Sequence, residues 1–128
     1  MNEKMFEHMY KRLKSRQLSF YAFLNKEFNI LNYKSARCSK HCFDSVDKPL
    51  AEVNQCLNVC RQGILECSDF AHNLQKESQD ALAKCQEEAY SQENLTDPVI
   101  HWMSCYEQLL LRFDKIEANI SDEFSNFV

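Results

Sequence analysis

The spacing of four cysteines constrains the fold of this chain more than any other feature of its sequence. Cys38 and Cys42 form one Cys-x3-Cys pair, and Cys56 and Cys60 form a second pair thirteen residues later. An i, i+4 spacing places both thiols of a pair on one face of a helix. Residues 38 and 60 are equidistant from Pro49, and residues 42 and 56 are equidistant from it as well.

Residues equidistant from the apex of an antiparallel helical hairpin lie opposite each other. A hairpin that turns at Pro49 therefore predicts a disulfide Cys38–Cys60. It also predicts a second, parallel disulfide, Cys42–Cys56. Each bridge closes a short loop and would stabilise the fold by about 3 kcal/mol in the chain-entropy model.

The same symmetry applies to a second turn. Cys85 and Cys105 are equidistant from Leu95, which lies in the predicted loop at 91–97. This predicts a disulfide Cys85–Cys105 between a second and a third helix. Only one symmetric pair of cysteines indicates this second hairpin, whereas two symmetric pairs indicate the first. Cys67 has a leucine, Leu31, at its mirror position, so we expect a buried free thiol there.

Zinc is the competing interpretation of the two close cysteine pairs, because four thiolates can form a tetrahedral zinc site. Zinc ribbons and knuckles usually carry tighter Cys-x2-Cys turns with glycine nearby, whereas these pairs lie on predicted helices. Redox catalysis would need a reactive Cys-x-x-Cys motif, which the chain lacks. The pattern therefore favours structural disulfides.

Scarcity of glycine and proline favours long helices with few corners. The 128 residues include one Gly and two Pro, whereas average usage would give roughly 15 in total. Such a chain can hardly form the many tight turns of a β-sandwich or barrel. It also has no glycine-rich phosphate loop and no G-x-S-x-G motif.

Apolar residues recur at steps of three and four, the period of an amphipathic helix. The predicted fold is all-α: a disulfide-stapled antiparallel helical hairpin over 18–92, extended by a third helix over 98–120 to an up-down-up arrangement. A basic, helical extension over 1–17 precedes the hairpin, and a tail over 121–128 follows the third helix. We expect a single domain, 1–128, and no apolar run approaches the ~18–20 residues of a membrane span.

Charge is distributed unevenly along the chain. Residues 1–50 hold ten basic and five acidic side chains, and residues 51–128 hold five basic and fourteen acidic ones. The basic cluster consists of Lys4, Lys11, Arg12, Lys14 and Arg16. It could contact the inner-membrane surface through acidic lipid heads, an acidic partner or nucleic acid, or be a solvated helix face. The acidic remainder argues against a dedicated nucleic-acid binder.

The cysteine pattern resembles two related groups of mitochondrial proteins. Twin Cys-x3-Cys pairs on a helical hairpin are the signature of the small Tim chaperones of the intermembrane space. The sequence-similarity-136 family carries Arg-Cys-Ser-x-x-Cys, thirteen residues, Gln-Cys-x-x-x-Cys, and then a further Cys-x3-Cys. The matching residues here are Arg37-Cys38-Ser39, Gln55-Cys56 and, at the start of the last pair, Cys85. The resemblance covers about residues 34–89 and implies a protein of the mitochondrial intermembrane space.

Two positions depart from that family pattern. Ala89 stands where the partner of Cys85 in the last pair would be, and His101 stands four residues before Cys105. The outer bridge of a second hairpin can form here, whereas the inner one cannot.

A surplus of large apolar residues on the first helix suggests a partner surface. These residues are Phe20, Tyr21, Phe23, Leu24 and Phe28. Consecutive apolar residues of this segment point to different faces of the helix. Large exposed apolar patches are rarely without a function. The alternative is burial under the N-terminal segment, which carries Met5, Phe6, Met9 and Leu13.

No catalytic constellation is recognisable in the sequence. The histidines His8, His41, His72 and His101 share no metal-ligand spacing, and we read His41 beside Cys42 as a surface residue. We therefore expect no enzyme activity, no cofactor, no metal and no small-molecule substrate.

The expected function is that of a structural or accessory subunit in a larger mitochondrial assembly at the inner membrane, such as a respiratory-chain complex. It would face the intermembrane space and be attached to the membrane through partner subunits. One alternative is a chaperone similar to the small Tim proteins, which would capture hydrophobic precursors through residues such as Phe20, Phe23 and Leu24. Another is a zinc-binding interaction module of the cytosol or nucleus.

Overall fold

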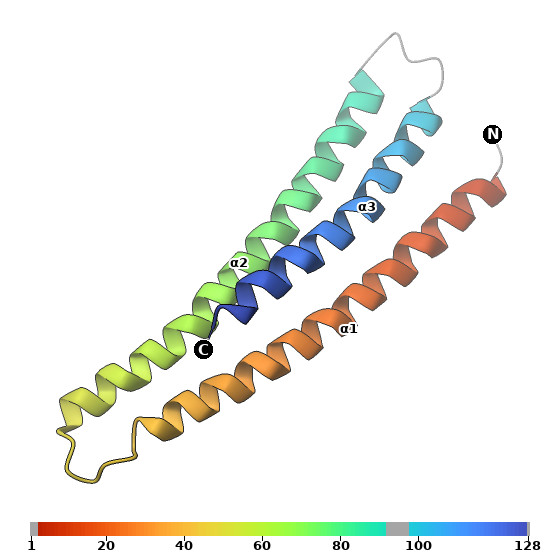
Figure 1. Ribbon diagram of the computed structural model, residues 1–128. Helices are drawn as coiled ribbons and strands as arrows, with labels where there is room; N and C mark the ends of the chain where they lie inside the picture. The colour runs from red at the N-terminus through yellow and green to blue at the C-terminus, as the bar shows by residue number, and fades with distance from the viewer. Residues whose placement is uncertain (1–2, 92–97, 128) are drawn as a thin grey trace.

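Three long helices make up the structure, a computed structural model that describes residues 3–91 and 98–127. α1 spans Glu3–His41, α2 spans Leu50–Ser91 and α3 spans Pro98–Ser125. Consecutive helices run in opposite directions, and the described residues contain no strand (Figure 1). The predicted all-α hairpin with a third helix is confirmed.

Two helices are longer than the sequence predicted. The basic segment that we expected as a separate extension is the first part of α1, which is unbroken from Glu3 to His41. α3 continues past residue 120 to Ser125, because its apolar stripe continues through the buried residues Ile116, Ile120 and Phe124. The predicted tail is thus mostly helix and contributes to the core.

The turn between α1 and α2 occupies residues 42–49. Pro49 ends it, and its carbonyl oxygen accepts the N–H groups of Glu52 and Val53 at 3.0 and 3.2 Å. These are the first bonds of α2, so the proline stands directly before the helix and needs no N–H of its own. The second turn was predicted at 91–97; Ser91 is the last residue of α2, and 92–97 lie outside the described residues.

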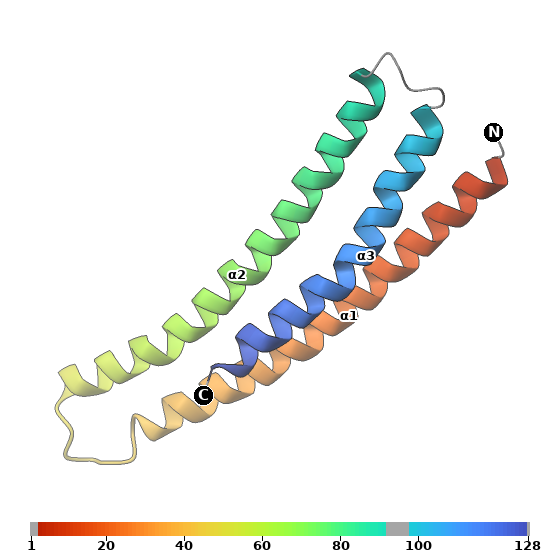
Figure 2. The same ribbon diagram turned by 45° about the horizontal axis from the view of Figure 1, so that its top comes forward.

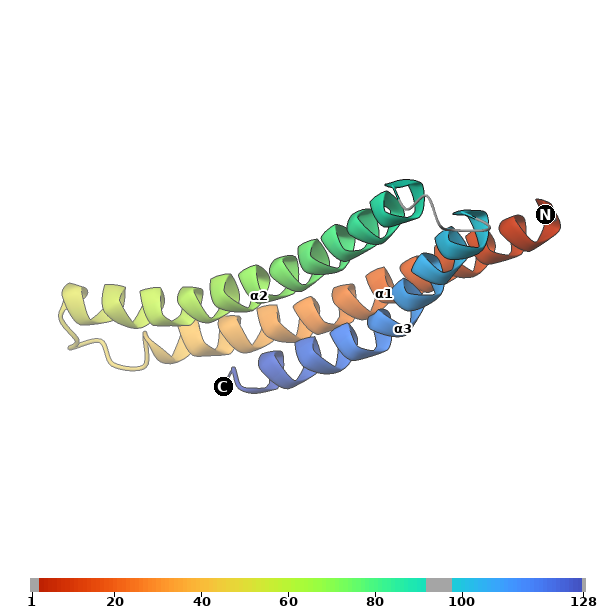
Figure 3. The same ribbon diagram turned by 90° about the horizontal axis from the view of Figure 1, so that it is seen from above.

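α3 lies against both other helices, but it covers only part of the hairpin. Figures 2 and 3 show that α3 ends well before the turn, while α1 and α2 continue side by side to it. The hairpin therefore has a three-helix part, which holds the core, and a two-helix part near the turn, which holds the two cysteine pairs.

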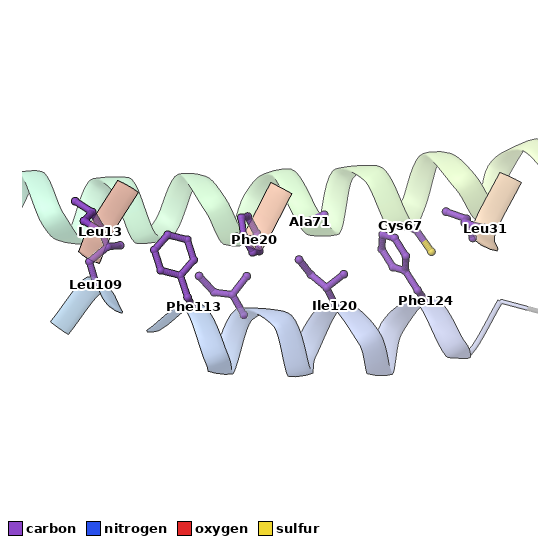
Figure 4. Packing of buried hydrophobic residues seen from close by; sticks show 10 residues of the cluster. Leu13, Phe20, Leu31, Cys67, Ala71, Leu109, Phe113, Ile120 and Phe124 are labelled. Carbon is purple, nitrogen blue, oxygen red and sulfur yellow. The ribbon is translucent and has the colours of Figure 1, made fainter. Parts of the chain in front are cut away.

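α3 contributes half of the buried residues of the core (Figure 4). Its buried cluster consists of Leu13, Phe20 and Leu31 from α1, Cys67 and Ala71 from α2, and Leu109, Phe113, Ile116, Ile120 and Phe124 from α3. The small residues of α2 face the large residues of α3, which lets these two helices approach closely. Burying each large side chain contributes about 1.5–3 kcal/mol.

One ion-pair cluster ties α1 to α3. Arg16 donates from Nη1 to Glu117 Oε1 at 2.7 Å and from Nη2 to Asp114 Oδ1 at 2.9 Å. Its guanidinium carbon also lies 5.3 Å from the ring centroid of Phe113, within the range of a cation–π contact. The hydrogen bond to Glu117 is the main cause that raises the pKa of Arg16.

The single glycine of the chain marks a close contact between α2 and the C-terminal end. Gly63 lies in the middle of α2, and a Cβ atom at this position would overlap the ring of Phe127. Lys34 holds the same end of the chain, because its Nζ donates to the main-chain oxygen of Phe127 at 3.2 Å. The absence of a side chain at Gly63 thus leaves space for the ring of Phe127, and α2 remains helical at this residue.

This contact predicts that Gly63→Ala changes the free energy of unfolding in opposite directions with and without the ring of Phe127. Alanine is favoured over glycine in a helix by about 1 kcal/mol, but it displaces the ring. We expect Gly63→Ala to lower the free energy of unfolding by about 0.5–1 kcal/mol in the wild type, because the lost ring packing exceeds the propensity gain. In a Phe127→Ala background the same change should raise it by about 1 kcal/mol. Urea unfolding of the four proteins, all oxidised, measures this cycle; equal effects in both backgrounds would contradict the contact.

Candidate functional site

Two disulfides join α1 to α2 close to the turn. Cys38–Cys60 and Cys42–Cys56 have the same Cα–Cα distance, 5.7 Å, which agrees with the parallel arrangement that the symmetry about position 49 predicts. The Sγ atoms of Cys42 and Cys60, which belong to different bridges, lie 3.9 Å apart and are buried. Both predicted pairings are confirmed, and the two bridges pack against each other as one sulfur cluster.

A third disulfide joins the other end of α2 to α3. Cys85 and Cys105 are bonded with a Cα–Cα distance of 5.8 Å, as predicted. Six of the seven cysteines are therefore paired. Cys67 is the remaining one, a free and buried thiol, again as predicted.

Cys67 belongs to the hydrophobic core and shows no sign of reactivity. It is 5% exposed, and burial is the main cause that raises the pKa of its thiol. The nearby carboxylates of Glu123 and Glu66 act in the same direction, and Lys34 opposes them. A reactive cysteine needs the opposite, a lowered pKa and access to solvent, so Cys67 is a packing residue.

The predicted partner surface on α1 is wrong in four of its five residues. Phe20 is 4% exposed, and its ring centroid lies 5.3 Å from that of Phe113 on α3. Phe23, Leu24 and Phe28 are partly buried against the same core. Tyr21 alone among the five is largely exposed, at 55%.

The reason is the position of α1 between two neighbours. The prediction assumed that a helix of this fold buries one face, whereas α1 packs against both α2 and α3 and buries a wider stripe. The alternative of burial under the N-terminal segment is also wrong, because that segment continues the same straight helix. Phe28, for example, packs edge-on against Phe124 of α3 at 5.0 Å.

The basic cluster is divided between structure and surface. Arg16 is committed to the ion pairs with α3, whereas the side chains of Lys11, Arg12 and Lys14 are exposed. Lys11, Arg12 and His8 line an open groove of about 650 Å³ between α1 and α3. The exposed members could meet an anionic surface without disturbing the fold.

A second hollow lies where α3 ends. Its volume is about 540 Å³. It is bounded by Cys38 and Cys56 of the cysteine pairs, by Ser125 and Phe127 at the C-terminal end, and by Lys34, Arg37 and His41 of α1. His41 donates or accepts a hydrogen bond with Asp44 at 2.9 Å and is exposed, as expected for a surface histidine.

The sequence analysis missed one neighbour of the third disulfide. His101 Nε2 lies 4.0 Å from Cys85 Sγ, and the donor atoms of Cys85, His101 and Cys105 all lie within 4.8 Å of one another. The signal was present: His101 stands one helical turn before Cys105, and positions 89 and 101 are equidistant from residue 95. The role of His101 depends on its proximity to Cys85 across the two helices, which the sequence pattern alone does not give.

Comparison with known proteins gives no relative. No protein-family model matches the chain, and no curated protein or solved structure matches it significantly. Among the described residues, none of the helices combines the length and apolarity needed to cross a membrane.

The raised pKa of Cys67 predicts a loss of stability at alkaline pH. The unfolded chain releases the thiol proton near its ordinary pKa of about 8.5, whereas the folded chain retains it to higher pH. The thiol therefore contributes stability that is fully present below about pH 8 and is lost as the pH rises through the folded pKa. We expect wild-type protein to lose more stability between pH 8 and 10 than Cys67→Ala, as measured by urea unfolding. Parallel pH profiles of the two proteins would contradict this.

Proposed function

We propose that this chain is a non-enzymatic structural subunit of a multi-subunit assembly at the mitochondrial inner membrane, on the side of the intermembrane space. The observation that supports it most is the number of large apolar side chains that α1 leaves exposed. These are Met5, Phe6, Tyr10, Leu18, Tyr21, Ile30 and Tyr33. They occur along the whole helix in addition to the stripe that builds the core.

The disulfides support the proposed location in the intermembrane space. Structural disulfides persist in oxidising environments and are rare in the reduced cytosol, and three of them join all three helices here. The twin Cys-x3-Cys pattern resembles proteins of the intermembrane space, which is an oxidising compartment. Both considerations rest on the cysteines of the chain, and both favour the same location.

The exposed residues of α1 suit a lasting protein contact. Leu18 and Tyr21 are one helical turn apart and are 62% and 55% exposed. Aromatic and aliphatic anchors of this kind carry much of the binding energy of protein interfaces. The exposed cations Lys11, Arg12 and Lys14 lie on the same part of α1 and would suit acidic side chains of a partner or anionic lipid heads beside it.

The chaperone alternative receives less support. It would use Phe20, Phe23 and Leu24 to capture precursors, and these side chains pack in the core with α3. They would become available only if α3 left the hairpin, which the disulfide Cys85–Cys105 opposes.

Co-migration tests the proposal. We expect the tagged chain, expressed in mitochondria and released with mild detergent, to migrate with a large inner-membrane complex on native gels. The double variant Leu18→Glu, Tyr21→Glu should migrate as a small species, because charges at these positions disrupt an apolar contact. The matched control is Leu65→Glu on α2, since Leu65 is 63% exposed and outside the proposed interface.

A small soluble particle for the wild type would contradict the proposal, as would a cytosolic location. Crosslinks to newly imported membrane-protein precursors would favour the chaperone instead. Circular dichroism and thermal unfolding of each variant show whether an altered migration reflects binding or misfolding.

A further inference from the structure

We propose that Cys85, His101 and Cys105 form a zinc site when the disulfide between the two cysteines is reduced. The inference rests on the geometry at this end of the bundle and is independent of the proposed function. In the oxidised chain the two cysteines hold α2 and α3 together covalently. In the reduced chain, zinc would hold these helices together in place of the disulfide.

The imidazole of His101 already lies close to ligand distance from one of the two sulfurs. A zinc ion with Zn–S bonds of about 2.3 Å and Zn–N bonds of about 2.0–2.1 Å requires a sulfur–nitrogen separation of roughly 3.6 Å. His101 Nε2 lies 4.0 Å from Cys85 Sγ. The imidazole is therefore within about half an ångström of ligand distance from Cys85 Sγ, and the donor atoms of Cys85, His101 and Cys105 all lie within 4.8 Å of one another.

The two sulfurs must move apart when their bond is broken, since two thiolates on one zinc lie roughly 3.8 Å apart. A small cavity of about 10 Å³ borders both cysteines. A contact that does not depend on the disulfide also joins the two helices here, because Gln86 Nε2 of α2 donates to the hydroxyl oxygen of Tyr106 of α3 at 3.3 Å.

The part of the chain that the structure describes supplies three ligands, which leaves a fourth position on the ion open. Ala89, equidistant with His101 from residue 95, is buried and offers no donor atom. His101 and Cys105 come from successive turns of one helix, so both lie on the same face toward Cys85. A set of two sulfurs and one nitrogen suits zinc, which binds such mixed ligands readily.

The exchange between disulfide and metal is a two-electron reaction in which two protons are taken up and then released. A dithiol reductant transfers two electrons and two protons to the Cys85–Cys105 bond and becomes a disulfide itself. Zinc then binds both sulfurs as thiolates, which releases the two protons, and binds the Nε2 lone pair of neutral His101. In the reverse direction a disulfide oxidant takes two electrons from the two thiolates and becomes a dithiolate, the Cys85–Cys105 bond forms and the ion leaves, so the metal and the disulfide exclude each other.

Cadmium and zinc binding to the full chain tests the site. The chain, reduced with a phosphine and kept free of oxygen, should take up ¹¹³Cd and give a resonance typical of two sulfur ligands with nitrogen. The donor cluster near the first turn consists of Cys42, Cys56 and Cys60, so a metal held by these three gives an all-sulfur signal. His101→Ala should lose the mixed signal and weaken zinc binding at this site at least about 100-fold, because even outer-shell partners are worth 10–100-fold. The control His72→Ala, on an exposed face of α2, should leave it unchanged.

A second readout uses the wild type alone and does not depend on how the variants fold. The ¹⁵N shift of His101 Nε2 should change on addition of zinc to the reduced chain and not to the oxidised chain. A mixed signal that survives in His101→Ala, or an imidazole unaffected by zinc, would overturn the proposal. So would uptake of zinc by the oxidised chain at this site.

Discussion

Two disulfides beside one turn set the geometry on which the rest of the structure depends. Cys38–Cys60 and Cys42–Cys56 fix two successive points along α1 and α2, so the register of the hairpin is determined before any core residue is considered. They lie in the two-helix part, where no third helix buries apolar surface. Covalent bonds there replace the stabilisation that packing provides elsewhere.

The third helix turns this hairpin into a domain with a core. α3 contributes half of the buried cluster and meets small residues of α2 and large residues of α1. Three further contacts fix its position: Arg16 with its two carboxylates, Phe127 on Gly63, and Cys85–Cys105 at the far end. These three contacts differ chemically, but each joins α3, or the residues directly after it, to one of the two hairpin helices.

The sequence predicted the covalent framework better than the surface. All three disulfides and the free thiol followed from symmetry about two turns, because helical hairpins obey a simple geometric rule. The partner surface failed since Phe20 and its neighbours were judged without knowing that α1 packs against two helices. Gly63 and His101 were visible in the sequence, yet their roles depend on Phe127 and Cys85, which only the folded chain brings near.

Counting free thiols by alkylation and intact mass, without reductant, tests the central claim that three disulfides staple this helical fold. We expect one modified cysteine, Cys67, after unfolding, and none in the native protein because that thiol is buried. Peptide mapping should then recover the pairs 38–60, 42–56 and 85–105. Seven modified cysteines in the protein isolated from its own compartment would contradict the account, because the hairpin would then lack the bonds that fix its register.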